Sequence, residues 1–126
     1  KYYQLNAGFP LLAEIRSLIL KAQVLLDRRL DQEITRLGDV RFLGLMGMFT
    51  GQSVEPPIDL FIVGHVKPED IKRLLTEVEK GFGLELNFSL MSLDEFRYRK
   101  EIGDRFLHSI LEAPKKVVID RLSERA

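Results

Sequence analysis

The spacing of hydrophobic positions changes along the chain, and each change predicts a different element. Over residues 10–37, apolar side chains recur at intervals of three and four, which predicts one long helix or two helices in tandem. Pro10 suits the first helical position and Gly38 suits the residue just past the end. Residues 40–46 are then apolar on both alternating faces, which predicts a strand buried inside a sheet and ending at Gly47.

The middle of the chain predicts a loop, a strand and a helix. Residues 48–57 have no hydrophobic period, so we expect a loop with room for one helical turn. An apolar run over residues 58–63 predicts a second strand that stops at Gly64, and Pro68 begins a helix that ends before Gly81. The inner face of this helix is expected to carry Ile71, Leu74, Leu75 and Val78.

The last third of the chain predicts two strands and two short helices. Strict alternation over residues 84–90 predicts a strand whose polar face carries Glu85, Asn87 and Ser89 and forms one wall of a potential site. Ser92 and Asp104 are the expected N-caps of helices that reach about residues 102 and 111, and residues 116–119 predict a short final strand. We therefore expect an α/β (α+β) fold, with a small mixed sheet of three or four strands flanked by helices.

Length and composition narrow the class of protein. The 126 residues suit a single domain over residues 1–126, with 45% hydrophobic and 30% charged residues typical of a globular chain. Nineteen basic residues balance nineteen acidic ones, so no net field draws this domain to nucleic acid or to an anionic membrane. The absence of cysteine excludes disulfides and thiolate metal sites and suits the cytoplasm, and apolar runs are too short to span a membrane.

One region combines residue types that suit a nucleotide pocket. The buried strand ends at Gly47, and the following loop contains Thr50 and Gly51. The next strand brings the carboxylate of Asp59 to the same edge of the sheet. Backbone amides of a glycine-rich turn are able to hold phosphate, so this layout favours a nucleotide site.

Residues across most of the chain carry a resemblance to a known family. They are Tyr2 to Asn6 with Phe9, Pro10 and Leu11, then Gly47, Phe49 and Gly51, Ile58 to Gly64, Glu85 to Asn87, Asp94 to Phe96, and Phe106 with Leu107. In these residues the chain resembles the minimal nucleotidyltransferase domains fused behind the winged-helix domain of transcriptional regulators. The resemblance implies a nucleotidyltransferase-like sheet, and residues 1–6 would be the remnant of an upstream winged-helix segment.

The chain departs from the family where the chemistry is carried. Active members have a serine that contacts phosphate and a pair of aspartates on the second strand, whereas Met48 and Pro57 stand here at the serine and first-aspartate positions. Asp59 alone remains of the pair, and Asn87 matches the third carboxylate. Nucleotidyl transfer uses clustered carboxylates to hold Mg²⁺ ions that bridge the phosphates of a nucleoside triphosphate, so the resemblance implies a catalytically silent domain.

The resemblance assigns a nucleotide-binding role to six positions. They are Gly47, Met48, Thr50, Gly51, Asp59 and Asn87, with Asp59 also the candidate metal ligand. The expected role is the ligand-sensing or dimerising part of a regulator that binds DNA only through its winged-helix domain. The apolar start of the first helix, residues 11–20, is the expected contact of a homodimer.

Several alternatives stay open. Glu85 shares a predicted strand face with Asn87, so an active transferase would use Asp59 and Glu85, together with Asp94, and would modify a small molecule, a protein or RNA. Without the resemblance, Asp59 reads as a solvated carboxylate or as the partner of Arg41 or Arg105. A further alternative is an oligomerisation module without a ligand. His65, His108 and the basic run at residues 97–100 are expected to be structural or solvated.

Overall fold

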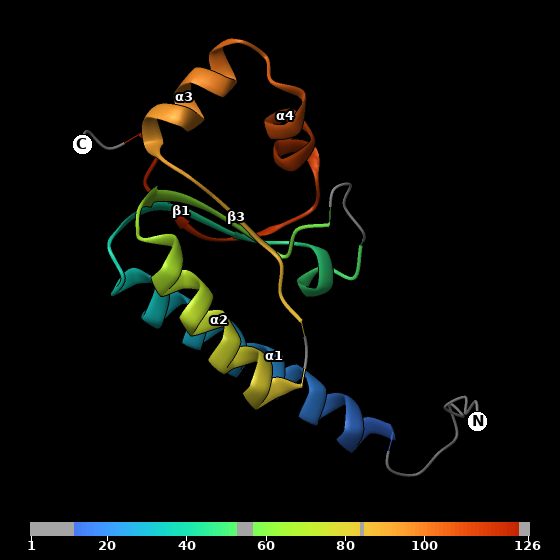
Figure 1. The fold of residues 1–126 in the computed structure, drawn as a ribbon. Helices are drawn as coiled ribbons and strands as arrows, with labels where there is room; N and C mark the ends of the chain where they lie inside the picture. Colours follow the sequence, from blue (N-terminus) through green and yellow to red (C-terminus); the bar gives the residue numbers. More distant parts are fainter. Residues whose placement is uncertain (1–11, 53–56, 84, 124–126) are drawn as a thin grey trace. The chain divides into compact units, whose positions relative to one another are not determined.

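The computed structural model describes residues 12–52, 57–83 and 85–123 (Figure 1). The predictions for Pro10 and for the junction at residues 1–6 lie outside these residues. The chain divides into two units, residues 1–30 and residues 31–126, which are described separately. The prediction of one domain over the whole chain stays a prediction.

The first unit contributes most of a single long helix, α1 (Leu12–Thr35). Of the two alternatives predicted for residues 10–37, one continuous helix is therefore correct over the described residues. Three apolar side chains of α1 are strongly exposed: Leu18 (66%), Val24 (52%) and Leu25 (61%). Exposed apolar residues are common singly, but three within eight positions of one helix form a surface that suits a partner.

The second unit contains a four-stranded mixed sheet. Its strands are β1 (Asp39–Leu45), β2 (Leu60–His65), β3 (Phe88–Met91) and β4 (Lys116–Asp120), in the order β3-β2-β1-β4. β1 is antiparallel to β2 and to β4, while β2 and β3 are parallel. Because β2 and β3 are parallel, the residues that precede them lie at one edge of the sheet and those that follow them lie at the opposite edge.

Helices connect and cover these strands. A single 3₁₀ turn, η1 (Gly47–Phe49), follows β1, and α2 (Pro68–Phe82) links β2 to β3. α3 (Leu93–Glu101) and α4 (Arg105–Glu112) lie between β3 and β4. Both predicted N-caps are confirmed, because Ser92 accepts the N–H of Glu95 at 3.0 Å and Asp104 accepts that of Leu107 at 2.9 Å. The described residues thus form the predicted α+β fold, with four α-helices and four strands.

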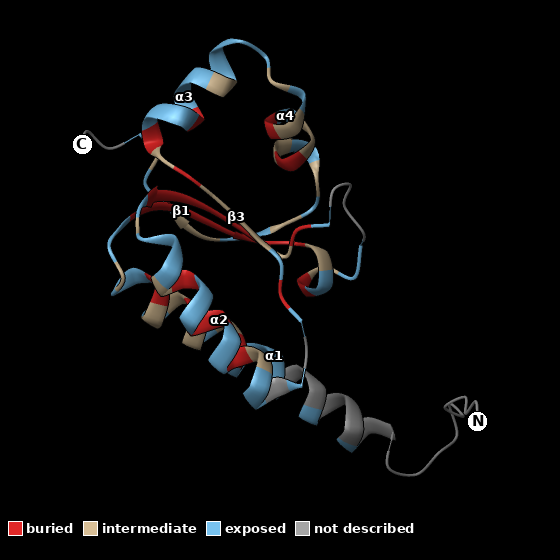
Figure 2. Ribbon diagram, viewed as in Figure 1, coloured by how far each residue is buried: buried red, intermediate tan, exposed pale blue. Residues whose placement is uncertain are grey.

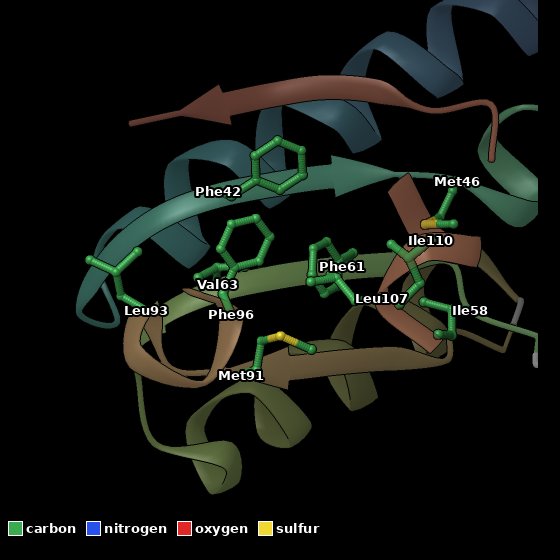
Figure 3. Close-up of a cluster of buried hydrophobic side chains, with 10 residues drawn as sticks. All are labelled: Phe42, Met46, Ile58, Phe61, Val63, Met91, Leu93, Phe96, Leu107 and Ile110. Carbon is green, nitrogen blue, oxygen red and sulfur yellow. The ribbon is translucent and has the colours of Figure 1, made fainter. Parts of the chain in front are cut away.

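The two faces of the sheet are packed by different helices. Figure 1 shows α2 on one face and α3 with α4 on the other. All four residues predicted for the inner face of α2 are buried. On the opposite face ten buried side chains from the sheet, the adjoining loops, α3 and α4 form one cluster (Figure 3), in which the ring of Phe61 lies 5.8 Å from that of Phe42 and 6.4 Å from that of Phe96. Figure 2 shows that the centre of the sheet is buried on both sides, which fixes its edges.

Three predicted element boundaries were wrong. Helix α2 does not end before Gly81 but continues to Phe82, because Gly83 supplies the left-handed C-cap (φ 65°). β2 begins at Leu60 rather than residue 58 and includes Gly64, since its pairing with β1 extends to His65.

The third error concerns the strand predicted at residues 84–90. β3 begins only at Phe88, and residues 85–87 are irregular. One reason is that the N–H of Leu86 donates to the carboxylate of Glu79 at 2.8 Å, so α2 rather than a neighbouring strand provides its acceptor. The predicted polar wall is therefore not one continuous strand face, and Ser89, which pairs with Phe61, is half-buried.

Candidate functional site

Asp59 lies in a bend immediately before β2, at the edge of the sheet where β1 ends and where β3 begins. The antiparallel pairing of β1 with β2 brings the β1–η1 junction to this bend, and the parallel pairing with β3 brings residue 87 to it. Gly47, Met48, Asp59 and Asn87, which the sequence connected only through the family resemblance, are thus close together. We refer to this group of four residues as the Asp59 corner.

All the hydrogen-bonding groups of Asp59 are used to join the ends of three strands. Its backbone N–H donates to the carbonyl of Asn87 (2.8 Å), and its carbonyl accepts the N–H of Met46 (2.8 Å). Its carboxylate Oδ1 accepts the N–H of Met48 (3.0 Å), and Oδ2 accepts the N–H of Asn87 (2.9 Å). Such charge-assisted bonds are stronger than neutral ones, so the carboxylate contributes directly to holding the corner closed.

Gly47 is required by the position of this carboxylate. Its φ of +57° lies in the left-handed region, which side chains other than glycine adopt at a cost. A Cβ at this position would also collide with Oδ1 of Asp59 and would lie 2.7 Å from the carbonyl oxygen of Ile58. The glycine that the sequence placed at a phosphate-binding turn therefore has a packing role, because it lets the turn approach Asp59.

The amides of the turn already have acceptors within the protein. Met48 donates to Asp59, Phe49 donates to the carbonyl of Met46 (3.1 Å), and Thr50 donates to the carbonyl of Gly47 (3.1 Å). The Thr50 hydroxyl also donates to that carbonyl, at 3.1 Å. A phosphate bound at these amides would have to displace internal hydrogen bonds. Gly51, which follows them, is exposed.

The other candidate acids do not join Asp59 in one cluster. Glu85 is exposed and, within the described part of the chain, makes no hydrogen bond or ion pair. Asp94 lies in the first turn of α3, after β3, and is separated from Asp59 by the four residues of that strand, a length of about 13 Å. Among the residues that the structure describes, no group of three or more histidine, aspartate or glutamate side chains is placed to hold a metal ion.

The cations suggested as simple partners of Asp59 lie elsewhere. Arg41 is buried (5% exposed) and its Nε donates to Asp39 at 3.1 Å, and no described ion pair joins Arg105 to Asp59. The expectation of an arginine partner is therefore corrected: backbone amides take that place. Sequence patterns reveal side-chain types, whereas a carboxylate held by backbone amides becomes visible only in three dimensions.

The remaining candidates lie on the surface or contribute to the fold. His65 at the end of β2 and His108 in α4 are both exposed. In the basic run, Arg99 pairs with Glu95 (3.0 Å) and Asp104 (3.3 Å), and its guanidinium lies 5.6 Å from the ring centre of Phe106. Arg99 thus ties α3 to the start of α4, while Arg97, Tyr98 and Lys100 are exposed.

Comparisons of this chain with protein-family models, with curated proteins and with solved structures gave no match. No helix within the described residues is long and apolar enough to cross a membrane. The candidate site is therefore interpreted from its own geometry and from the sequence motifs.

Proposed function

We propose that this chain is a catalytically silent nucleotidyltransferase-like domain that serves as the ligand-sensing or dimerising part of a cytoplasmic winged-helix transcriptional regulator. DNA binding belongs to the winged-helix domain and not to this one, whose nineteen basic and nineteen acidic residues balance. The observation that carries the proposal is the Asp59 carboxylate, whose two oxygens each accept a backbone N–H.

The chemistry of nucleotidyl transfer explains why this observation matters. The reaction needs several carboxylates directed at metal ions, which neutralise the charge on the phosphates and activate the attacking hydroxyl. Here Asp59 is directed at backbone amides, Asn87 replaces a carboxylate, and Pro57 stands at the other family position. A carboxylate in this arrangement stabilises the corner, and its neighbours supply little negative charge for two Mg²⁺ ions.

The proposal is tested by an assay for nucleotide turnover. The chain is incubated with Mg²⁺ and each of the four labelled ribonucleoside triphosphates, and transfer of label and release of pyrophosphate are measured. We expect neither to exceed the level without protein. Turnover that is lost in both Asp59→Asn and Glu85→Gln would establish the competing assignment, an active transferase that uses these two acids.

The dimerising role is supported by the exposed apolar residues of α1. Leu18, Val24 and Leu25 are all more than half exposed, and burying such side chains contributes about 1.5–3 kcal/mol each. Sedimentation velocity should detect a dimer that the Leu18→Gln/Leu25→Gln variant weakens. The exposed polar pair Lys21→Gln/Gln23→Ala on the same helix is the matched control, and a monomer at all accessible concentrations would leave only the ligand-sensing role.

A further inference from the structure

The edge of the sheet opposite the Asp59 corner contains an open crevice of about 710 Å³. It lies where β2 and β3 end, and it is lined by the segments that lead from these strands into α2 and α3, together with Leu37. Ligand sites in proteins generally have volumes of about 300–1,000 Å³, so this crevice is large enough for a small molecule. The sequence gave no signal for it, because its lining comes from segments far apart in the chain.

The topology of the sheet gives this crevice its significance. β2 and β3 are adjacent and parallel, but the helix that follows β2 covers one face of the sheet and the helix that follows β3 covers the other (Figure 1). The two connections therefore diverge and leave a gap between them. In open α/β sheets, ligands bind outside the carboxyl ends of the strands at such a switch point.

Close backbone contacts hold one rim of the crevice in place. A Cβ on Gly38 would collide with the carbonyl oxygen of His65, and one on Gly64 would collide with the carbonyl oxygen of Asp39. These two glycines let the start of β1 approach the end of β2 closely. The backbone at His65, from which the crevice lining continues to Lys67, is thereby fixed by packing.

The charged groups of the crevice are unequally satisfied. Its two carboxylates each have a cation on their own helix, with Asp70 3.6 Å from Arg73 and Glu95 3.0 Å from Arg99. Neither Lys67 nor His65 makes a side-chain hydrogen bond or an ion pair to any residue that the structure describes. The groups that remain available to a ligand are therefore those of an ammonium and an imidazole, which bind anions.

We propose that this crevice binds a small organic anion with an apolar body. A carboxylate or phosphate group of the ligand contacts Lys67 and His65, and the apolar body lies against Val66 and Leu90 at the floor. The hydroxyl of Ser92 is a further donor on the side of α3. This site is independent of the nucleotidyltransferase resemblance, which concerns the other edge of the sheet.

The test is an NMR titration of the ¹⁵N-labelled chain at 150 mM salt with phenyl phosphate and with benzoate, and with benzyl alcohol as the neutral control. We expect saturable shifts of the amides of Gly64, His65, Lys67 and Ser92 with at least one of the two anions, and much weaker effects of the alcohol. The stronger anion identifies the head group as a phosphate or a carboxylate. The proposal fails if neither anion saturates, or if the shifts concentrate at Met48 and Asn87.

Two matched variants separate a specific contact from general charge. Lys67→Gln should weaken binding of the stronger anion about tenfold, as expected for loss of a hydrogen bond to a charged group. Lys72→Gln removes the same charge from an exposed position on α2 outside the crevice and should leave the affinity within about twofold. Equal weakening by both variants would show screening of net charge and would overturn the site. The nucleotide turnover assay is unaffected by either outcome, so the two proposals fail separately.

Discussion

The two edges of the sheet treat their polar groups in opposite ways. At the Asp59 corner the ends of three strands converge, and the carboxylate that a sequence motif marks as chemical is bound to backbone amides. At the crevice two parallel strands separate toward opposite faces, and a lysine and a histidine without motif value have no partner among the described residues. The comparison teaches that the partners of a residue, rather than its place in a motif, indicate whether it is available for chemistry.

The difference has a physical origin in how strands end. Where strands converge, backbone N–H groups beyond the last ladder bond still need acceptors, and burial without them is costly. Asp59 supplies two acceptors at the point where β1, β2 and β3 meet. At the other edge the chain turns directly into α2 and α3, whose own hydrogen bonds satisfy most of the backbone, so the side chains there are not needed for this purpose.

The largest effect is expected for Gly47→Ala, which attacks the closed corner directly. The left-handed backbone and the collision with Asp59 and Ile58 should lower the free energy of unfolding by about 3 kcal/mol, measured by urea denaturation. Gly51→Ala is the control, because a Cβ there meets nothing within 4 Å although its φ is also positive, at 72°. The control should cost only the backbone term, about 1 kcal/mol. Equal losses would mean that the approach of Gly47 to Asp59 is unimportant.

Asp59→Ala should lower the free energy of unfolding by about 2 kcal/mol, because two charge-assisted hydrogen bonds are lost at a half-buried position. Glu85→Ala, an exposed acid near the same edge, should change it by less than about 0.5 kcal/mol. In the Asp59→Ala background, Gly47→Ala should cost at least about 1 kcal/mol less than alone, since one of its collisions is removed. Strict additivity of the two substitutions would contradict the contact between them.

The elements that the sequence predicted well are those in which local pattern and tertiary packing agree. The inner face of α2 and the caps Ser92 and Asp104 follow from spacing alone, and all are confirmed. The boundaries that failed depend on contacts between distant residues. β3 starts late because Glu79 on α2 takes the N–H of Leu86, and Gly64 stays within β2 because Asp39 pairs across from His65.

The same division applies to the candidate sites. The sequence brought Gly47, Met48, Asp59 and Asn87 into one group, and their backbones do lie close together. It could not show that the carboxylate faces amides rather than solvent, because hydrogen-bond direction depends on the register of three strands. The crevice was missed altogether, since a switch point exists only once strand order and the faces covered by the helices are known.

A smaller effect is expected on the crevice side from Ser92→Ala, which removes an N-cap hydrogen bond. The free energy of unfolding should fall by about 1 kcal/mol, a typical cost for losing a serine cap. Ser92→Asp retains an acceptor for the N–H of Glu95 and should restore most of the loss. Lys67→Gln at the same edge should leave the stability unchanged within about 0.5 kcal/mol, because its side chain supports no described contact. A large loss in Lys67→Gln would show that the lysine is structural and would bring the two edges closer in character.

The smallest effect on stability is expected for Met48→Ser, which restores the residue type that active nucleotidyltransferases carry at this position. The Met48 group that binds Asp59 is its backbone N–H, which any residue except proline supplies, and its side chain is 42% exposed. The free energy of unfolding should therefore change by less than about 0.5 kcal/mol. No pyrophosphate release should appear with Mg²⁺ and nucleoside triphosphates, because a serine adds a phosphate contact but no metal ligand, and the oxygens of Asp59 still accept two amides. Measurable turnover in this single variant would show that the corner opens to metal ions after all, and the contrast between a closed and an open edge would then no longer hold.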